Sequence, residues 1–436
     1  MTSGNQTWLQ RSAHSVWHPC SQMKHHEALP LVPVKRGEGV WLEDFDGKRY
    51  LDGVSSWWVN LFGHNHPQIK TAIIEQLHQL EHVILAGFTH EPVIQLSERL
   101  SSLTGLGHSF YASDGASATE IALKMSFHYW RNHGQDAKNR FLSLQNGYHG
   151  ETLGSLSVTD VALFKETYAS LLRESVQLPS PDWRLAGPGE DARQYALRCA
   201  EQAGNYIAQH HDSIAALIVE PLVQCATGMA MYHPIYLQRL REICDRYEVH
   251  LIADEIAVGF GRTGTMFACE QANIRPDFIC LSKGITGGYL PLSVVQTTDE
   301  VYAAFYDDNI TRGFLHSHSY TGNALACSAA LATLDIFAQQ DVLNSNRRKA
   351  AYLNQQLAAW DDLPISQLRN TGMIWAFDVV DSQPGFQQRF YQAALQRGLL
   401  LRPMGNTVYF MPPYIITESE IDFMLEQTVA VLKDSI

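Results

Sequence analysis

The chain has 436 residues, of which 45% are hydrophobic and 18% are charged, and this balance is typical of a globular protein. Its 32 Lys and Arg residues against 45 Asp and Glu residues give a net charge of −13, which argues against nucleic acid or an anionic membrane as the main partner. No apolar segment resembles a signal peptide or a membrane span, and the seven cysteines include no C-x-x-C pair, so we expect a cytoplasmic protein with reduced cysteines.

The chain order of predicted elements indicates an α/β protein with two domains. Residues 1–60 contain a predicted hairpin with its turn at Asp46-Gly47 and should join a smaller domain. Residues 61–335 should form the large domain, because helical stretches alternate there with short apolar runs, which favours a largely parallel sheet covered by helices. The predicted strands are 109–113, 140–145, 215–220, 250–255, 277–283 and 291–297. Residues 336–436 should form a small α+β domain, with strands at 373–380, 399–403 and 407–413.

Three of the predicted strands end in polar groups, namely Glu220, Asp254 and Lys283. Ligands of open α/β sheets bind beyond the carboxyl ends of the strands, so these groups should lie along one edge. A lysine there could simply extend its amine into solvent over a packed stem. Pyridoxal phosphate (PLP), however, needs both a lysine for covalent attachment and a carboxylate facing its pyridine nitrogen. Lys283 and Asp254 therefore predict a PLP site.

A phosphate group needs a cradle, and a helix start rich in small residues offers one. The segment 113–130 starts with Ser113-Asp114-Gly115 and then has helical periodicity, and such a helix start offers N–H groups and a positive dipole end. Ser117 and Glu120 match the spacing of a capping box. A second helix start in 316–330 could add donors through Ser319.

Other patterns carry weaker signals. The histidine pairs at 64/66 and 316/318 lack neighbouring carboxylates or cysteines, so we expect no metal site. The sequence GFGRTG (259–264) does not open a βαβ unit and is no dinucleotide fingerprint. Trp57-Trp58 could be part of the core or could form the wall of an apolar substrate slot.

Five motifs resemble those of the class III (ω-amino acid) aminotransferases, which bind PLP in fold type I. They are NGYHGETLGS (146–155), IVEPLVQ (218–224), LIADEIAVGFGRTG (251–264), CLSKGITGG (280–288) and YTGNALA (320–326). The resemblance implies an aspartate aminotransferase-like fold, in which a large domain with a mostly parallel seven-stranded sheet binds PLP beside a smaller α+β domain. It also implies a homodimer with active sites at the subunit interface.

The resemblance implies a role for each matching residue. Lys283 would hold PLP covalently, Asp254 would face the pyridinium nitrogen, and Tyr148 would lie against the ring and touch substrate. Gly115 and Ala116 would bind the phosphate. His318 and Ser319 would reach the phosphate of the neighbouring subunit, and Ser317 would touch that subunit's substrate. The remaining implied substrate contacts are Trp57, Arg402 and Cys20. Arginine suits a carboxylate because it can bind both oxygens.

The chain departs from the class pattern at several of these positions. Cys20 replaces a tyrosine that usually recognises substrate. Ala116 replaces a hydroxyl residue, so backbone N–H groups must hold the phosphate. HSHSY (316–320) replaces HGPTF but keeps a hydroxyl at Ser319, and Glu151 replaces an aspartate.

Three narrower motifs resemble one branch of the class: WHPCSQM (17–23), DGVSSWWVNLFGHNHP (52–67) and LLRPMGNTVYFMPPYII (400–416). That branch converts 8-amino-7-oxononanoate to 7,8-diaminononanoate in biotin biosynthesis. We expect this reaction with S-adenosyl-L-methionine as amino donor, and lysine as the alternative donor. The rival interpretations are another ω-aminotransferase acting on 4-aminobutyrate, ornithine or a diamine, and a non-catalytic PLP-binding relative. A nicotinamide oxidoreductase is disfavoured.

Overall fold

The computed structural model describes residues 4–380 and 382–435, which divide into two compact units. The larger unit contains Gln68–Arg347 and Arg369–Ile374, and the smaller unit contains the described residues up to Pro67, Arg348–Leu368 and those from Trp375 onward. The sequence placed these boundaries after residues 60 and 335. The second boundary lies later because α11 (Ala324–Gln339) packs along its length against α4 (Glu91–Thr104) and stays in the larger unit.

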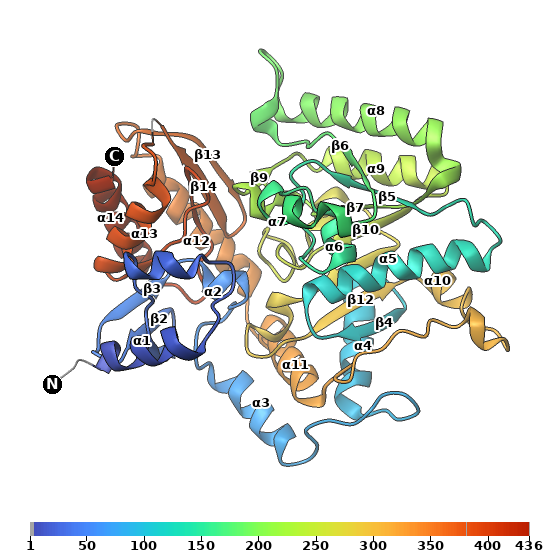
Figure 1. The fold of residues 1–436 in the computed structure, drawn as a ribbon, viewed down its shortest axis with the longest axis horizontal. Coiled ribbons are helices and arrows are strands. Elements are labelled where there is room, and N and C mark those ends of the chain that lie inside the picture. The colour runs from blue at the N-terminus through green and yellow to red at the C-terminus, as the bar shows by residue number, and fades with distance from the viewer. Residues whose placement is uncertain (1–3, 381, 436) are drawn as a thin grey trace. The chain divides into compact units, whose positions relative to one another are not determined.

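The larger unit is built on a seven-stranded sheet with the order β4-β12-β11-β10-β7-β5-β6 (Figure 1). Its strands are β4 (His108–Ala112), β5 (Arg140–Leu144), β6 (Val176–Leu178), β7 (Ile214–Val219), β10 (His250–Asp254), β11 (Phe278–Leu281) and β12 (Ser293–Thr297). Within this sheet β12 pairs antiparallel with β4 and β11, while the other pairs are parallel. The predicted fold class, an α/β protein with a mostly parallel seven-stranded sheet, is confirmed.

The central strands β7, β10 and β11 are buried along their whole length, which explains their unbroken apolar runs. Helix α5 (Gly115–Asn132) runs across β7, β10, β11 and β12, and α9 (Ile235–Arg246) packs on β10 and α8 (Ala192–His210) (Figure 1). The unit also contains a small sheet of β8 (Val223–Gln224) and β9 (Ala230–Met231). Its other helices are α3 (Pro67–Leu77), α6 (Leu153–Val158), α7 (Ala162–Lys165), α10 (Asp299–Ala303), η2 (Glu166–Leu171), η3 (Trp183–Leu185), η4 (His211–Ser213), η5 (Cys225–Thr227), η6 (Ala268–Ala272), η7 (Lys283–Thr286) and η8 (Ile310–Arg312).

The smaller unit has a four-stranded sheet with the order β1-β2-β3-β15. Its strands are β1 (Val34–Glu38), β2 (Trp41–Asp44), β3 (Arg49–Asp52) and β15 (Leu399–Leu400). The predicted hairpin is confirmed: β2 and β3 pair antiparallel, and Gly47 adopts the positive φ of 87° that such a turn requires. β15 is shorter than predicted and pairs in parallel with β3, so the C-terminal part of the chain completes an N-terminal sheet.

A three-stranded sheet follows the order β13-β14-β16 and uses β13 (Ile365–Thr371), β14 (Ile374–Val379) and β16 (Thr407–Phe410). The helices not yet named are α1 (Gly4–Ser15), η1 (Met23–Glu27), α2 (Ser55–Trp58), α12 (Val342–Leu357), α13 (Phe386–Gln396) and α14 (Glu418–Ser435). Among the described residues, no helix has the length and apolar character needed to cross a membrane.

Candidate active site

The three polar strand ends lie side by side, as predicted, because β7, β10 and β11 are neighbours in the sheet. Parallel pairing sets Val219 against Ala253 and Asp254 against Cys280, so Glu220, Asp254 and Lys283 leave the same edge. Glu220 and Asp254 are only 5% and 4% exposed. Burial raises the pKa of Glu220 to about 7, although nearby His149 acts against this shift.

Asp254 is held by a residue to which the sequence assigned no role. His149 Nδ1 lies 2.7 Å from Asp254 Oδ2, and the backbone N–H of Ile256 donates to Oδ1 at 3.1 Å. His149 is 2% exposed, and its Nε2 atom has no hydrogen-bond partner among the described residues. The only sequence signal for His149 was its place in the motif at 146–155. This contact fixes the carboxylate expected to face the cofactor nitrogen.

Lys283 begins η7 with a positive φ of 47°, a strained conformation for a residue with a side chain. The preceding Ser282 donates to the backbone oxygen of Leu292 at 2.8 Å and anchors this turn to the start of β12. Burial lowers the pKa of the Lys283 amine, while the charges of Asp254 and Glu220 partly oppose the shift. The amine therefore lies within electrostatic range of both strand-end carboxylates.

The predicted phosphate cradle is the first turn of α5. Asp114 caps this helix by accepting from the N–H of Ser117 at 2.9 Å and from its hydroxyl at 3.0 Å. The expected capping box is therefore wrong: Ser117 is inside the helix, and Glu120 instead accepts from the N–H of Gly154 at 2.8 Å. Among the described residues, the N–H groups of Gly115 and Ala116 have no backbone partner. They remain available to an anion.

The loop that carries Tyr148 and His149 packs directly on this helix start. A Cβ atom on Gly150 would lie 2.6 Å from the Cβ of Ala116, so the two backbones approach closely. The Ser155 hydroxyl donates to Ala116 O at 2.8 Å. Tyr148 donates its N–H to Glu220 Oε2 at 2.9 Å and its hydroxyl to Glu151 at 2.9 Å. The structure thus brings the loop together with the strand end of Glu220 and with the cradle.

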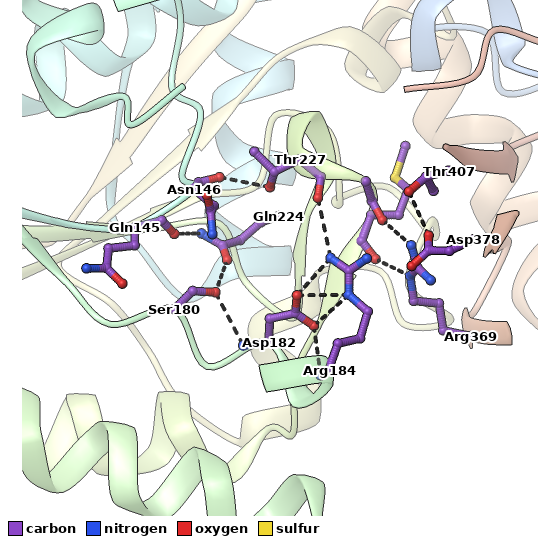
Figure 2. Close-up of polar contacts among 12 residues, drawn as sticks. Gln145, Asn146, Ser180, Asp182, Arg184, Gln224, Thr227, Arg369, Asp378 and Thr407 are labelled. Carbon is purple, nitrogen blue, oxygen red and sulfur yellow. Dashed lines mark hydrogen bonds and ion pairs between the residues drawn. The ribbon is translucent and has the colours of Figure 1, made fainter. Parts of the chain in front are cut away.

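A polar clasp anchors the beginning of this loop, as Figure 2 shows. Gln224 Nε2 donates to Gln145 O at 2.9 Å, and the Ser180 hydroxyl donates to Gln224 Oε1 at 2.5 Å. Thr227 donates to Asn146 O at 2.9 Å. The buried Arg369 donates to the carbonyl groups of residues 228 and 229 at 2.6 and 3.1 Å and so secures the segment that carries Thr227. The clasp holds the backbone that leads into Tyr148.

The smaller unit contains three of the predicted substrate residues, Trp57, Arg402 and Cys20. The guanidinium carbon of Arg402 lies 5.2 Å from the ring centre of Trp57, so these two residues form a cation–π pair. Trp57 is 46% exposed, whereas Trp58 is 5% exposed and belongs to the core. Cys20 is exposed and lies just before η1.

The segment 316–320 is partly exposed in the single chain. Ser317 and Ser319 are exposed. His318 Nε2 lies 2.9 Å from His316 Nε2, and Lys124 Nζ lies 2.7 Å from His316 Nδ1. In the parts of the chain that the structure describes, no three or more His, Cys, Asp or Glu side chains form a group that could hold a metal ion.

These residues fit PLP on structural grounds. The first turn of α5 offers N–H donors, and Gly115 leaves no spare room, because an added Cβ would lie 3.0 Å from Ile256. The fixed Asp254 carboxylate suits a pyridinium nitrogen, and Lys283 supplies an amine of lowered pKa. The arrangement is that of an enzyme acting through a lysine-bound cofactor with an anionic group.

Comparison with known proteins gives the class. The family model for class-III aminotransferases matches residues 22–432, and the chain belongs to this family of PLP-dependent aminotransferases. A protein of Helicobacter pylori named adenosylmethionine-8-amino-7-oxononanoate aminotransferase is 45% identical over 96% of each chain. The crystal structure of the enzyme of that name from Methanocaldococcus jannaschii has a TM-score of 0.93 at 34% identity and covers 99% of both chains. An amine transaminase from an uncultivated Pseudomonas species, crystallised with PLP bound, has a TM-score of 0.91 at 34% identity over 97% of this chain and 99% of its own.

Proposed function

We propose that this aminotransferase converts 8-amino-7-oxononanoate to 7,8-diaminononanoate in biotin biosynthesis, with PLP on Lys283 and S-adenosyl-L-methionine as the amino donor. The observation that carries the proposal is the convergence of Lys283, Asp254 and the first turn of α5 at one sheet edge. The names of the Helicobacter and Methanocaldococcus relatives supply the substrate and the donor.

The residues of the larger unit perform the common chemistry of the class. PLP, when bound, acts as an electron sink for charge that develops on the substrate carbon. Lys283 Nζ accepts the proton that this carbon loses, because burial lowers the pKa of the amine and favours its neutral form. Asp254, fixed by His149, would pair with the pyridine nitrogen of PLP. Gly115 and Ala116 would donate to the phosphate, and Tyr148 would lie against the ring and contact substrate.

The residues of the smaller unit select the substrate in this proposal. Arg402 binds the carboxylate of 8-amino-7-oxononanoate through two N–H groups, and the indole of Trp57 packs along its aliphatic chain. Cys20 contacts the amino donor with a side chain smaller than the tyrosine usual in the class. The choice between S-adenosyl-L-methionine and lysine as donor depends on this position.

We also propose a homodimer that works in the cytoplasm. Ser317, His318 and Ser319 then contact the substrate and phosphate bound by the neighbouring subunit. Residues 306–320, which include these three, expose large apolar side chains: Tyr306 is 81%, Leu315 74% and Tyr320 64% exposed. Burying these side chains would favour association. All seven cysteines are unpaired, which suits a reducing compartment.

The test is turnover of 8-amino-7-oxononanoate by the purified protein with PLP, using S-adenosyl-L-methionine, lysine, ornithine and 4-aminobutyrate as separate donors. We expect S-adenosyl-L-methionine to support the fastest turnover. Lys283→Ala should abolish both turnover and the visible absorption band of lysine-bound PLP, whereas Lys35→Ala, at an exposed position on β1, should change neither. Normal turnover by Lys283→Ala would refute the assignment. Faster turnover of another ketone would change the proposed substrate but not the assignment to the aminotransferases.

A further inference from the structure

Four consecutive residues that are not glycine adopt a left-handed conformation at the start of the smaller unit. Ser55, Ser56, Trp57 and Trp58 have φ values of 50°, 47°, 73° and 70°. Residues with a Cβ atom adopt this conformation at an energetic cost, and single residues rather than runs are the rule. Such strain persists only where surrounding contacts enforce it, and it gathers at functional sites.

The main enforcing group is Asp52, a fully buried carboxylate at the end of β3. Its Oδ1 atom accepts from the N–H of Ser56 at 2.9 Å, and its Oδ2 atom accepts from the hydroxyl of Ser56 at 2.7 Å. His64 Nε2 lies 3.0 Å from Oδ2. Asn60 Nδ2 lies 3.2 Å from His64 Nδ1, and His64 Nε2 faces Asp52. One carboxylate therefore accepts three hydrogen bonds across the turn.

Two further contacts fasten the ends of the turn to β16 and the residue after it. The Ser55 hydroxyl donates to Met411 O at 2.7 Å, and Trp58 Nε1 lies 3.2 Å from the hydroxyl of Tyr409. These contacts bury Trp58 and leave the indole of Trp57 exposed. The left-handed turn thus decides which of the two tryptophans faces outward.

Asp52 is also connected to Arg402 through the sheet. Asp52 pairs with Leu400 in the parallel β3–β15 ladder, and Arg402 follows two residues after Leu400. A Cβ on Gly53 would lie 2.7 Å from Leu401 Cδ2, so the two segments remain in close contact beyond the ladder. The guanidinium of Arg402 therefore meets the indole of Trp57.

We propose that Asp52 is a positioning residue that preforms a substrate clamp from Trp57 and Arg402. The indole packs against the guanidinium, and the N–H groups of the guanidinium can bind a carboxylate. The clamp fits a substrate with an aliphatic chain that ends in a carboxylate. This inference rests on the proposed function, because the substrate it serves is 8-amino-7-oxononanoate.

The kinetic test compares two buried aspartates of the same hairpin. Asp52→Asn keeps the size of the side chain, but its amide nitrogen cannot accept from Ser56 or His64. We expect the KM for 8-amino-7-oxononanoate to rise about tenfold, the effect of losing hydrogen bonds to a charged group, with a much smaller change in kcat. The methyl ester of this substrate should show little difference between the variant and wild type. Asp44→Asn is the control, because Asp44 is 2% exposed and accepts from Tyr50 and the Lys48 N–H; its KM should stay unchanged.

A structural readout tests the clamp without turnover. In protein labelled with fluorotryptophan, the ¹⁹F resonance of Trp57 is assigned by its loss in Trp57→Phe. Asp52→Asn and Arg402→Leu should both shift this resonance, and Asp44→Asn should not. Ser56→Ala removes one hydroxyl contact and leaves the Asp52 carboxylate paired with His64, so it should shift the Trp57 resonance less than Asp52→Asn does. It replaces Asp52→Asn in this test if that variant does not fold.

The two readouts separate the inference from the function on which it rests. Failure of the wild-type protein to aminate 8-amino-7-oxononanoate would remove the proposed function, and the ¹⁹F resonance would then decide the structural role of Asp52 alone. An unchanged Trp57 resonance, or an unchanged KM for the carboxylate substrate in an active wild-type background, overturns the positioning role.

Discussion

Gly150 offers a sharp test of the phosphate cradle, because it lies where the Tyr148 loop touches the start of α5. Its φ is 125°, outside the region that other residues favour. A Cβ atom there would lie 2.6 Å from Ala116 Cβ, 2.9 Å from Ala116 Cα and 3.0 Å from Ser155 Cβ. Gly150→Ala must therefore displace either the loop or the first turn of the helix.

The expected magnitude follows from two separate costs. The unfavourable φ costs about 1–2 kcal/mol, and overpacking of a well-filled site costs about 1–3 kcal/mol. The sum is about 2–5 kcal/mol of lost stability. The cradle N–H groups of Gly115 and Ala116 lie in the displaced turn, so part of this loss should appear as weaker PLP binding. Since about 1.4 kcal/mol corresponds to a factor of ten, we expect the Kd for PLP to rise at least tenfold.

The assay is titration of the PLP-free protein with PLP, followed by absorbance, together with urea unfolding of both forms. Gly134→Ala is the matched control, because Gly134 lies just beyond the other end of α5, has a φ of 71° and has no atom within 4 Å of an added Cβ. The control should lose only the conformational cost, about 1–2 kcal/mol, and keep its PLP affinity. Wild-type PLP affinity in Gly150→Ala would refute the placement of the cradle at this helix start.

Two further predictions concern buried groups near the strand ends. His149→Phe leaves Asp254 Oδ2 without its partner at 2.7 Å. The lost hydrogen bond to a charged group should cost about 1.5–3 kcal/mol of free energy, and PLP binding should weaken at least tenfold. An unchanged PLP titration would contradict a positioning role for His149. Burial raises the pKa of Glu255 to about 7, so the folded state holds this proton more tightly than the unfolded state does. The free energy of unfolding of the PLP-free protein should therefore fall between about pH 4.5 and pH 7, by up to about 3 kcal/mol. Glu255→Gln should flatten this dependence in urea unfolding, and Glu98→Gln, at an exposed position in α4, should not; equal slopes in all three proteins would contradict it.

The parts of the site that the sequence could predict are those governed by a local rule. Buried parallel strands are continuous apolar runs, and their carboxyl ends align at one edge, so Asp254 and Lys283 could be placed together from their spacing. The large sheet followed from the same runs, except for β6, which has three residues and gives too short a pattern. The Asp46-Gly47 turn was equally local, because the dipeptide itself specifies the backbone.

The parts that the sequence could not predict depend on contacts between distant segments. His149 reaches Asp254 across 105 residues, and nothing in its loop marks it as the partner of a strand end. The left-handed turn at 55–58 contains no glycine or asparagine that would signal a positive φ, because the buried carboxylate of Asp52 enforces it from outside the turn. The N-cap of α5 was misassigned because Asp114 and Ser117 both suit that position, and only the backbone decides between them.

This division follows the chemistry of the enzyme. In the proposed function, Lys283 holds PLP covalently and Asp254 faces its pyridine nitrogen, and the register of the adjacent strands β10 and β11 sets where both residues leave the sheet. Substrate selection, as proposed, uses Trp57 and Arg402, which are 345 positions apart and which the parallel pairing of β15 with β3 helps to bring together. Substitutions that disturb this pairing, such as at Gly53 or Asp52, should therefore change which ketone is accepted before they change the ability to transfer an amino group. In this proposal, the residues for amino transfer follow from the ends of neighbouring strands, whereas the residues for substrate selection depend on a long-range contact.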